Sequence, residues 1–104
     1  MAYRVKISDR AKWDLSGIYR FIRAERSELA FRWYLGLRDA IQSLKENPSR
    51  CTPTPEDKLY RHLLYGRNTD VYRVVFKIIE APKLVEIVHI RHGAQRPLTS
   101  ADLN

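Results

Sequence analysis

Residues 71–79 read VYRVVFKII, a stretch dense in β-branched and aromatic residues that predicts a central β-strand. Residues 84–90 read LVEIVHI and predict the next strand, because the segment between them contains Pro82 and is typical of a turn. Successive side chains of a strand point to opposite faces, so Arg73, Val75 and Lys77 share one face. The even-numbered residues of 72–78 share the other. The sequence therefore predicts a strand pair with one apolar face and one partly basic face.

The residues before this strand pair predict one strand and two helices. Residues 3–7 alternate apolar and basic side chains, as a half-buried strand does. Apolar residues at helical spacing then predict helices over Ser8–Glu25 and Ser27–Asn47, each with a serine able to cap its first turn. The short break between them favours an antiparallel hairpin. The side chains that we expect on its inner face are Leu15, Ile18, Ile22, Trp33, Leu37 and Ile41.

Between the helices and the central strand lies a segment with few regular signals. Pro48–Asp57 holds three prolines and is expected to be a loop. Leu59–Leu64 predicts a short strand, and Gly66–Asp70 predicts the turn that leads into the central strand. The element order is thus β-α-α-β-β-β, an α+β fold with the helix hairpin packed on one face of a mostly antiparallel sheet. At 104 residues the whole chain, 1–104, is expected to form one domain.

Composition and charge exclude several classes of protein. No run of about 18 apolar residues predicts a membrane span, and the N-terminal residues lack the apolar run of a signal peptide. Cys51 is the single cysteine, so the chain can form neither an internal disulfide nor a thiolate metal cage. We therefore expect a cytoplasmic protein. The net charge of +7 points to an anionic partner, either nucleic acid or an acidic protein segment.

The common fingerprints of enzymes, cofactor sites and metal sites are absent from the sequence. His89 and His92 stand near the end of a predicted strand, where alternation is expected to turn them to opposite faces and prevent a shared metal. We therefore predict no cofactor and no metal.

Cationic residues gather instead on the last three predicted strands. Arg73 and Lys77 are expected on the open sheet face, and Arg61 and His62 on the short strand could join them. Arginines in such a group can hold phosphate or carboxylate oxygens through paired hydrogen bonds. The residues predicted to bind a target or a partner are Lys58, Arg61, Arg73, Lys77, Arg91, His92 and Arg96.

The order of these motifs resembles the RelE/ParE superfamily of toxins. The resemblance is carried by YRVVF at residues 72–76, by VEIVHIRHGA at 85–94, by AKxDLxxIYxFI at 11–22 and by LxxNP at 44–48. It covers nearly the whole chain. It implies the toxin of a type II toxin–antitoxin pair, neutralised in a hetero-oligomer by a cognate antitoxin protein.

The superfamily contains two mechanisms, and the resemblance leaves both open. Members similar to RelE cut messenger RNA on the ribosome, which would assign catalytic roles here to Arg73, His92 and Arg96. The His-Gly-Ala sequence at 92–94 is more like ParE toxins, which act on DNA gyrase without cleaving RNA. The tail after Pro97 has no Tyr, His or Lys to transfer protons, so we favour gyrase poisoning and assign no catalytic residue. An inactive toxin-fold binding module would have the same sequence pattern.

Overall fold

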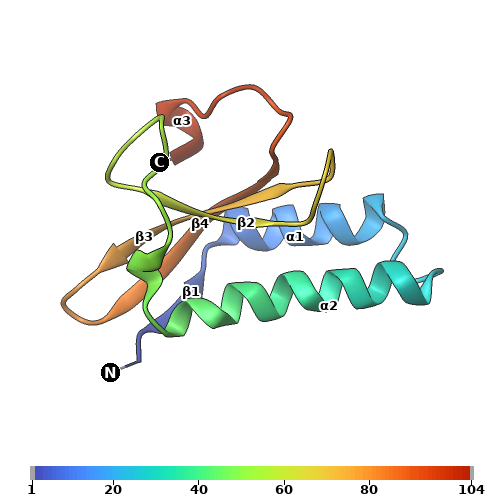
Figure 1. Ribbon diagram of the computed structural model, residues 1–104, viewed down its shortest axis with the longest axis horizontal. Helices are drawn as coiled ribbons and strands as arrows, with labels where there is room; N and C mark the ends of the chain where they lie inside the picture. Colours follow the sequence, from blue (N-terminus) through green and yellow to red (C-terminus); the bar gives the residue numbers. More distant parts are fainter. Residues whose placement is uncertain (1, 104) are drawn as a thin grey trace.

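A computed structural model describes residues 2–103 of the chain. Its strands and helices are β1 (Arg4–Ile7), α1 (Asp9–Phe21), α2 (Glu28–Gln42), β2 (Arg61–Tyr65), β3 (Tyr72–Ile79), β4 (Leu84–His92) and α3 (Ser100–Leu103) (Figure 1). Two short 3₁₀ turns follow α2, at Ser43–Lys45 and Pro48–Arg50. Within the described residues, no helix is both long enough and apolar enough to cross a membrane. The predicted order β-α-α-β-β-β is confirmed, and α3 is an additional element.

The four strands form one mixed sheet in the order β1-β4-β3-β2. β1 runs parallel to β4, whereas β4, β3 and β2 are antiparallel neighbours. The helix hairpin lies on one side of this sheet and the C-terminal segment lies on the other (Figure 1). The sheet is therefore the middle layer of the molecule.

The helix-covered face of the sheet holds the main core. Leu15 and Ile18 of α1 and Leu37 and Ile41 of α2 are buried there, which confirms the predicted register of both helices. The other two residues predicted for the inner face, Ile22 and Trp33, are only half-buried at its border. The sheet contributes Tyr72, Val74, Phe76, Val85, Ile87 and Ile90 to this core.

Both predicted helix starts are confirmed, because the hydroxyls of Ser8 and Ser27 accept hydrogen bonds from the third residue of each helix, Ala11 and Ala30. The predicted ends are wrong. The first helix stops at Phe21 rather than near Glu25, and the second at Gln42 rather than at Asn47.

A Schellman motif ends α1 early. Arg23 adopts a left-handed conformation with φ of 57°, and the amide of Ala24 donates to the carbonyl of Tyr19 at 3.1 Å. The amide of Arg23 itself donates to the carbonyl of Arg20 at 3.1 Å. Glycine usually fills this left-handed position, so the arginine gave no signal of a helix end.

The opposite face of the sheet is covered by the chain's own C-terminal segment. Leu98 and Leu103 are buried there against Val75 of β3, with Tyr60 and Val88 beside them. The hydroxyl of Tyr60 donates to the carbonyl of Leu103 at 3.0 Å. Arg73, Val75 and Lys77 lie on the predicted face, but that face is not open as expected.

Candidate functional site

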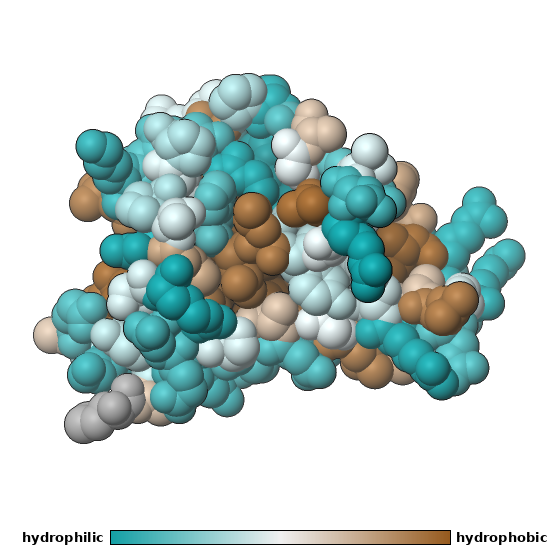
Figure 2. All heavy atoms as spheres, viewed as in Figure 1, coloured by the Kyte–Doolittle hydropathy of each residue, from teal (hydrophilic) through white to brown (hydrophobic). Residues whose placement is uncertain are grey.

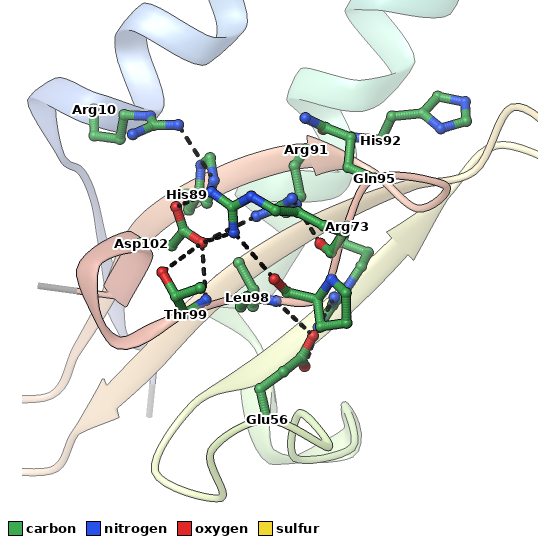
Figure 3. A network of polar contacts seen from close by, with 12 residues as sticks. Arg10, Glu56, Arg73, His89, Arg91, His92, Gln95, Leu98, Thr99 and Asp102 are labelled. Carbon is green, nitrogen blue, oxygen red and sulfur yellow. Dashed lines mark hydrogen bonds and ion pairs between the residues drawn. The ribbon is translucent and has the colours of Figure 1, made fainter.

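The tail-covered face carries a group of polar and charged side chains, which we name the sheet-face cluster (Figure 3). Arg73 and Arg91 are direct neighbours across β3 and β4, so their side chains emerge side by side. A carboxylate comes from the loop before β2 and another from α3. The cluster consists of Glu56, His62, Arg73, Arg91, Arg96 and Asp102.

Glu56 holds Arg73 through two parallel hydrogen bonds. Arg73 Nη1 and Nη2 each donate to one oxygen of the Glu56 carboxylate at 2.8 Å, and the Arg73 side chain is only 12% exposed. The amide of Leu98 also donates to Glu56 at 3.0 Å, which ties the tail to this pair. The Arg73 hydrogen bonds lower the pKa of Glu56 to about 2, so the carboxylate is ionised at neutral pH.

His62 is the imidazole of this cluster. Its Nδ1 accepts a hydrogen bond from Arg73 Nε at 3.1 Å. Burial, together with the nearby Arg73 cation, lowers the pKa of His62 below its ordinary value. His62 is therefore a neutral acceptor that orients the guanidinium of Arg73. The sequence analysis expected that His62 could join Arg73 on this face, and the two side chains are in contact.

Arg91 is the most deeply buried cation of the cluster, with a side chain only 3% exposed. Its Nη2 donates to the carbonyl of Arg96 at 2.7 Å, and its Nη1 reaches Asp102 at 3.4 Å. Its Nε has no hydrogen-bond partner; among the buried side-chain nitrogens and oxygens of residues 2–103, it is the one left unsatisfied. Arg91 therefore has one buried hydrogen-bond donor without an acceptor.

Asp102 connects the tail to the cluster. It accepts hydrogen bonds from Arg96 Nη1 at 2.9 Å and from the amide of Thr99 at 2.9 Å. The second bond is one half of a capping box, in which the acid three residues after a cap returns to the cap's amide. The Arg96 bond and the Thr99 amide hold the pKa of Asp102 far below its ordinary range.

The structure brings together three of the seven predicted binding residues, Arg73, Arg91 and Arg96. Lys77 lies farther along the same face, where it pairs with Glu86 at 3.6 Å. Arg61 instead donates to the carbonyls of Ser49 and Cys51, so it holds the preceding loop to β2.

The remaining two predicted residues, Lys58 and His92, lie outside the cluster. Lys58 is exposed in the loop before β2. His92 packs its ring edge-on against Tyr72 at 5.0 Å, on the helix-covered side, and its Nδ1 accepts from the amide of Ala94 at 3.0 Å. Arg73, Arg96 and His92, the three residues of the nuclease alternative, therefore do not meet at one point.

The strand register keeps His89 and His92 on opposite faces, as predicted. His89 pairs with Val75 of the tail-covered face, and His92 pairs with Tyr72 of the helix-covered face. A bulge at Val88 precedes both histidines, and His89 Nδ1 lies 2.6 Å from Asp14 of α1. Across residues 2–103, no group of three or more His, Cys, Asp or Glu side chains is placed to hold a metal ion.

A second surface, which the sequence did not reveal, lies between α1 and the end of β4. This α1 groove has a volume of about 380 Å³ and is lined by Trp13, Asp14, Gly17, Ile18, Phe21, Tyr72, Ile90, Arg91, His92 and Gln95. Trp13 and Phe21 are 70% and 80% exposed, although both are large aromatic residues. Figure 2 shows hydrophobic residues reaching the surface at the end of the molecule where α1 passes into α2. Exposed apolar surface of this kind is typical of protein interaction sites.

The spacing of residues on α1 explains how this groove was missed. Trp13, Gly17 and Phe21 are four residues apart and share one side of the helix. Gly17 leaves open space between the two rings, since a Cβ built there would contact nothing within 4 Å. The exposed side of a helix is normally polar. Two aromatic residues on that side with a glycine between them were therefore the signal in the sequence that could have indicated the groove.

Comparison with known proteins identifies the family. The model of the ParE toxin of type II toxin–antitoxin systems, parDE, matches residues 5–97. A search of curated proteins found no match.

Solved structures share the fold at low sequence identity. A chain of the chromosomal ParDE toxin–antitoxin system from P. aeruginosa is 19% identical with a TM-score of 0.69, covering 88% of this chain and 96% of that chain. A mutant of E. coli toxin RelE in the free state is 14% identical with a TM-score of 0.61, covering 90% and 86%. A chain of the RelBE2 toxin–antitoxin complex from Mycobacterium tuberculosis is 22% identical with a TM-score of 0.56, covering 91% and 95%. The fold is thus that of RelE/ParE toxins, and the chain belongs to the ParE toxin family of type II toxin–antitoxin systems.

Proposed function

We propose that this ParE-family toxin inhibits bacterial growth by binding and poisoning DNA gyrase in the cytoplasm, and that a cognate antitoxin neutralises it. The observation that carries the proposal is the state of the sheet-face cations. Arg73 and Arg91 are engaged by the chain's own Glu56 and Asp102, and a folded tail lies over them. This arrangement favours a toxin that acts by binding over one that needs an open cleft for phosphodiester chemistry.

The proposed contact with gyrase is the α1 groove. Trp13 and Phe21 project from α1 into solvent, so they offer aromatic contact area that the fold itself does not use. Aromatic residues on such surfaces supply a large share of binding energy in protein interfaces. The sheet-face cations, in contrast, are proposed to serve the antitoxin; the similar RelBE2 structure from Mycobacterium tuberculosis is that of a toxin–antitoxin complex.

The test is a gyrase assay with purified protein. The chain is expected to inhibit supercoiling or to trap cleaved DNA with gyrase. Trp13→Ala and Phe21→Ala are expected to weaken this at least 10-fold without unfolding the protein, since neither side chain is in the core. Leu29→Ala is the matched control, because Leu29 is 79% exposed on the other helix. Equal inhibition by all four proteins would reject the α1 groove, and no inhibition at all would reject gyrase as the target.

The antitoxin part of the proposal has a separate test in cells. Induced expression of this chain alone is expected to stop growth, and co-expression of the neighbouring small open reading frame is expected to restore it. A chain that is harmless at high expression would instead be an inactive binding module.

A ribosome-dependent mRNA endoribonuclease is the second candidate, and His62 is the observation in its favour. Its imidazole lies 3.1 Å from Arg73, so a proton acceptor and a phosphate-binding cation are adjacent. Primer extension on translated mRNA after induction separates the two functions. Breaks that disappear in His62→Gln, with gyrase unaffected, would establish the nuclease.

A further inference from the structure

Three arginines stand where α1 passes into α2, at one end of the molecule (Figure 1). They are Arg20, Arg23 and Arg26, which we name the hairpin corner. All three are exposed, and Figure 2 shows hydrophilic side chains extending into solvent at this end. Arg10 and Arg32 of the same two helices each bond to a carboxylate four residues away, whereas the corner side chains have no ion-pair or hydrogen-bond partner among residues 2–103. The corner cations are therefore free to bind an external anion.

The backbone of the hairpin corner is fixed, although its side chains are free. Ala24 is only 4% exposed, and its amide donates to the carbonyl of Tyr19 at 3.1 Å. The amide of Arg26 donates to the carbonyl of Arg23 at 3.0 Å. The three arginines therefore start from fixed positions on the surface, and only their long side chains move.

Carboxylates near the hairpin corner do not neutralise it. Residues 20–28 contain three arginines against two glutamates, Glu25 and Glu28. Glu28 is already held by Arg32, whose Nη2 donates to it at 2.7 Å. Glu25 is exposed and lies between Arg23 and Arg26 in the sequence without forming an ion pair with either. The corner therefore keeps a net positive charge and attracts anions.

Free arginines of this kind suit the phosphates of DNA better than the carboxylates of a protein. A protein carboxylate has one place in its own fold, so each arginine would lose rotamer freedom in order to meet it. Phosphates repeat along DNA and carry condensed counterions, whose release drives the binding of cations without fixing their side chains. The hairpin corner, with unheld side chains on a fixed backbone, therefore fits a phosphate backbone.

We propose that the hairpin corner binds the phosphate backbone of duplex DNA beside the toxin's contact with gyrase. The corner is continuous with the α1 groove, because Arg20 precedes Phe21, which lines that groove. The inference rests on the proposed function in taking this DNA to be the segment that gyrase holds. Two linked contacts give a toxin more affinity for the complex of enzyme and DNA than for either alone.

The first test measures DNA binding without gyrase. Fluorescence anisotropy follows the full chain on a short labelled duplex at several salt concentrations. The corner variant combines Arg20→Gln, Arg23→Gln and Arg26→Gln. The matched control combines Arg4→Gln, Lys6→Gln and Lys45→Gln, which removes the same charge from exposed positions at the other end of the molecule. Arg26→Gln alone lies outside both helices and serves as a mild second variant.

The affinity of the wild type is expected to fall steeply with salt, and the corner variant is expected to have a shallower dependence. Each phosphate contact contributes about 0.9 to the slope of log K against log salt, so the slope is expected to fall by about 2–3 in the corner variant and by about 1 in Arg26→Gln. The control is expected to change it by less than about 1. Equal slopes in the corner variant and the control would overturn the proposal. So would equally tight, corner-dependent binding of poly-L-glutamate, which would make the corner a site for acidic polypeptides.

The second test adds gyrase, with and without DNA. The corner variant is expected to bind the gyrase–DNA complex about 10-fold more weakly than the wild type and to bind gyrase alone equally well. An equal loss in both cases would overturn the proposal, because the corner would then contact the enzyme. The two proposals fail separately. Gyrase inhibition that does not depend on the corner would overturn the DNA contact and leave the target standing, whereas corner-dependent DNA binding without gyrase inhibition would reject the target and leave the DNA surface standing.

Discussion

The two faces of the sheet are covered in different ways. On one face, α1 and α2 bury a continuous apolar core that includes Leu37 and Phe76. On the other face, Leu98 and Leu103 form a small cluster with Val75, Tyr60 and Val88, and ion pairs lie beside it. The first face depends on a repeated pattern along two helices, whereas the second depends on a few residues that are distant in the sequence. We expect the first to set the stability of the fold and the second to be adjustable.

The largest expected effect is on the helix-covered face. Leu37→Ala removes a fully buried side chain from the centre of the core and is expected to lower the free energy of unfolding by about 2–5 kcal/mol. Urea denaturation followed by circular dichroism measures this. Leu29→Ala, on the exposed side of the same helix, is expected to change it by less than about 0.5 kcal/mol. Similar losses in both variants would contradict the division between the two sides of α2.

A smaller effect is expected on the tail-covered face. Glu56→Gln removes the charge that holds Arg73 in place and leaves that cation largely shielded from water, at a cost of about 1–3 kcal/mol. The control is Glu28→Gln, which breaks the exposed Glu28–Arg32 pair and is expected to cost less than about 0.5 kcal/mol. If Glu56→Gln unfolded the protein as readily as Leu37→Ala, the tail-covered face would not be the weaker one.

The same face is expected to weaken in acid. The pKa of Glu56 is about 2 in the folded chain and near 4.5 in the unfolded chain, so its stabilisation is complete above about pH 4.5 and is lost as the pH falls toward 2. Asp102 acts in the same direction, because Arg96 also lowers its pKa. The loss is expected to be smaller than that in Glu56→Gln at neutral pH, because the carboxylate of the folded chain, with a pKa of about 2, is still mostly ionised at pH 3. Thermal melts from pH 7 to pH 3 test this, and Glu56→Gln should have the flatter profile; parallel profiles would show that Glu56 is not responsible.

The two faces also differ in how well the sequence predicted them. Both helices, their serine caps and the order of elements along the chain follow from periodicity and turn residues, which are local signals. The face of Arg73 also followed from strand alternation. Alternation fails only across Val88, because one extra residue there puts Ile87 and Ile90, three residues apart, on the same face, and no residue type marks a bulge.

The partners of the sheet-face cations could not be predicted in the same way. Glu56 lies in a proline-rich loop 17 residues from Arg73, and nothing local indicates which cation it meets. Asp102 did have a local signal, because Thr99 and Asp102 have the spacing of a capping box and so predict a helix start. Reading that motif would have indicated a folded tail, but not the face on which it lies.

The smallest expected effect concerns the end of α1, where the helix-covered face was predicted least well. Arg23 holds a left-handed backbone conformation that costs a residue with a side chain about 1–2 kcal/mol and costs glycine almost nothing. Arg23→Gly is therefore expected to stabilise the fold, by about 0.5–1 kcal/mol after the added chain entropy of glycine in the unfolded state is subtracted. Urea denaturation measures the gain. The control is Arg20→Gly, the same substitution at an ordinary helical position of α1, which is expected to destabilise the fold by about 1 kcal/mol. A loss of stability in Arg23→Gly would mean that the Arg23 side chain, rather than the Schellman backbone, ends the helix at Phe21.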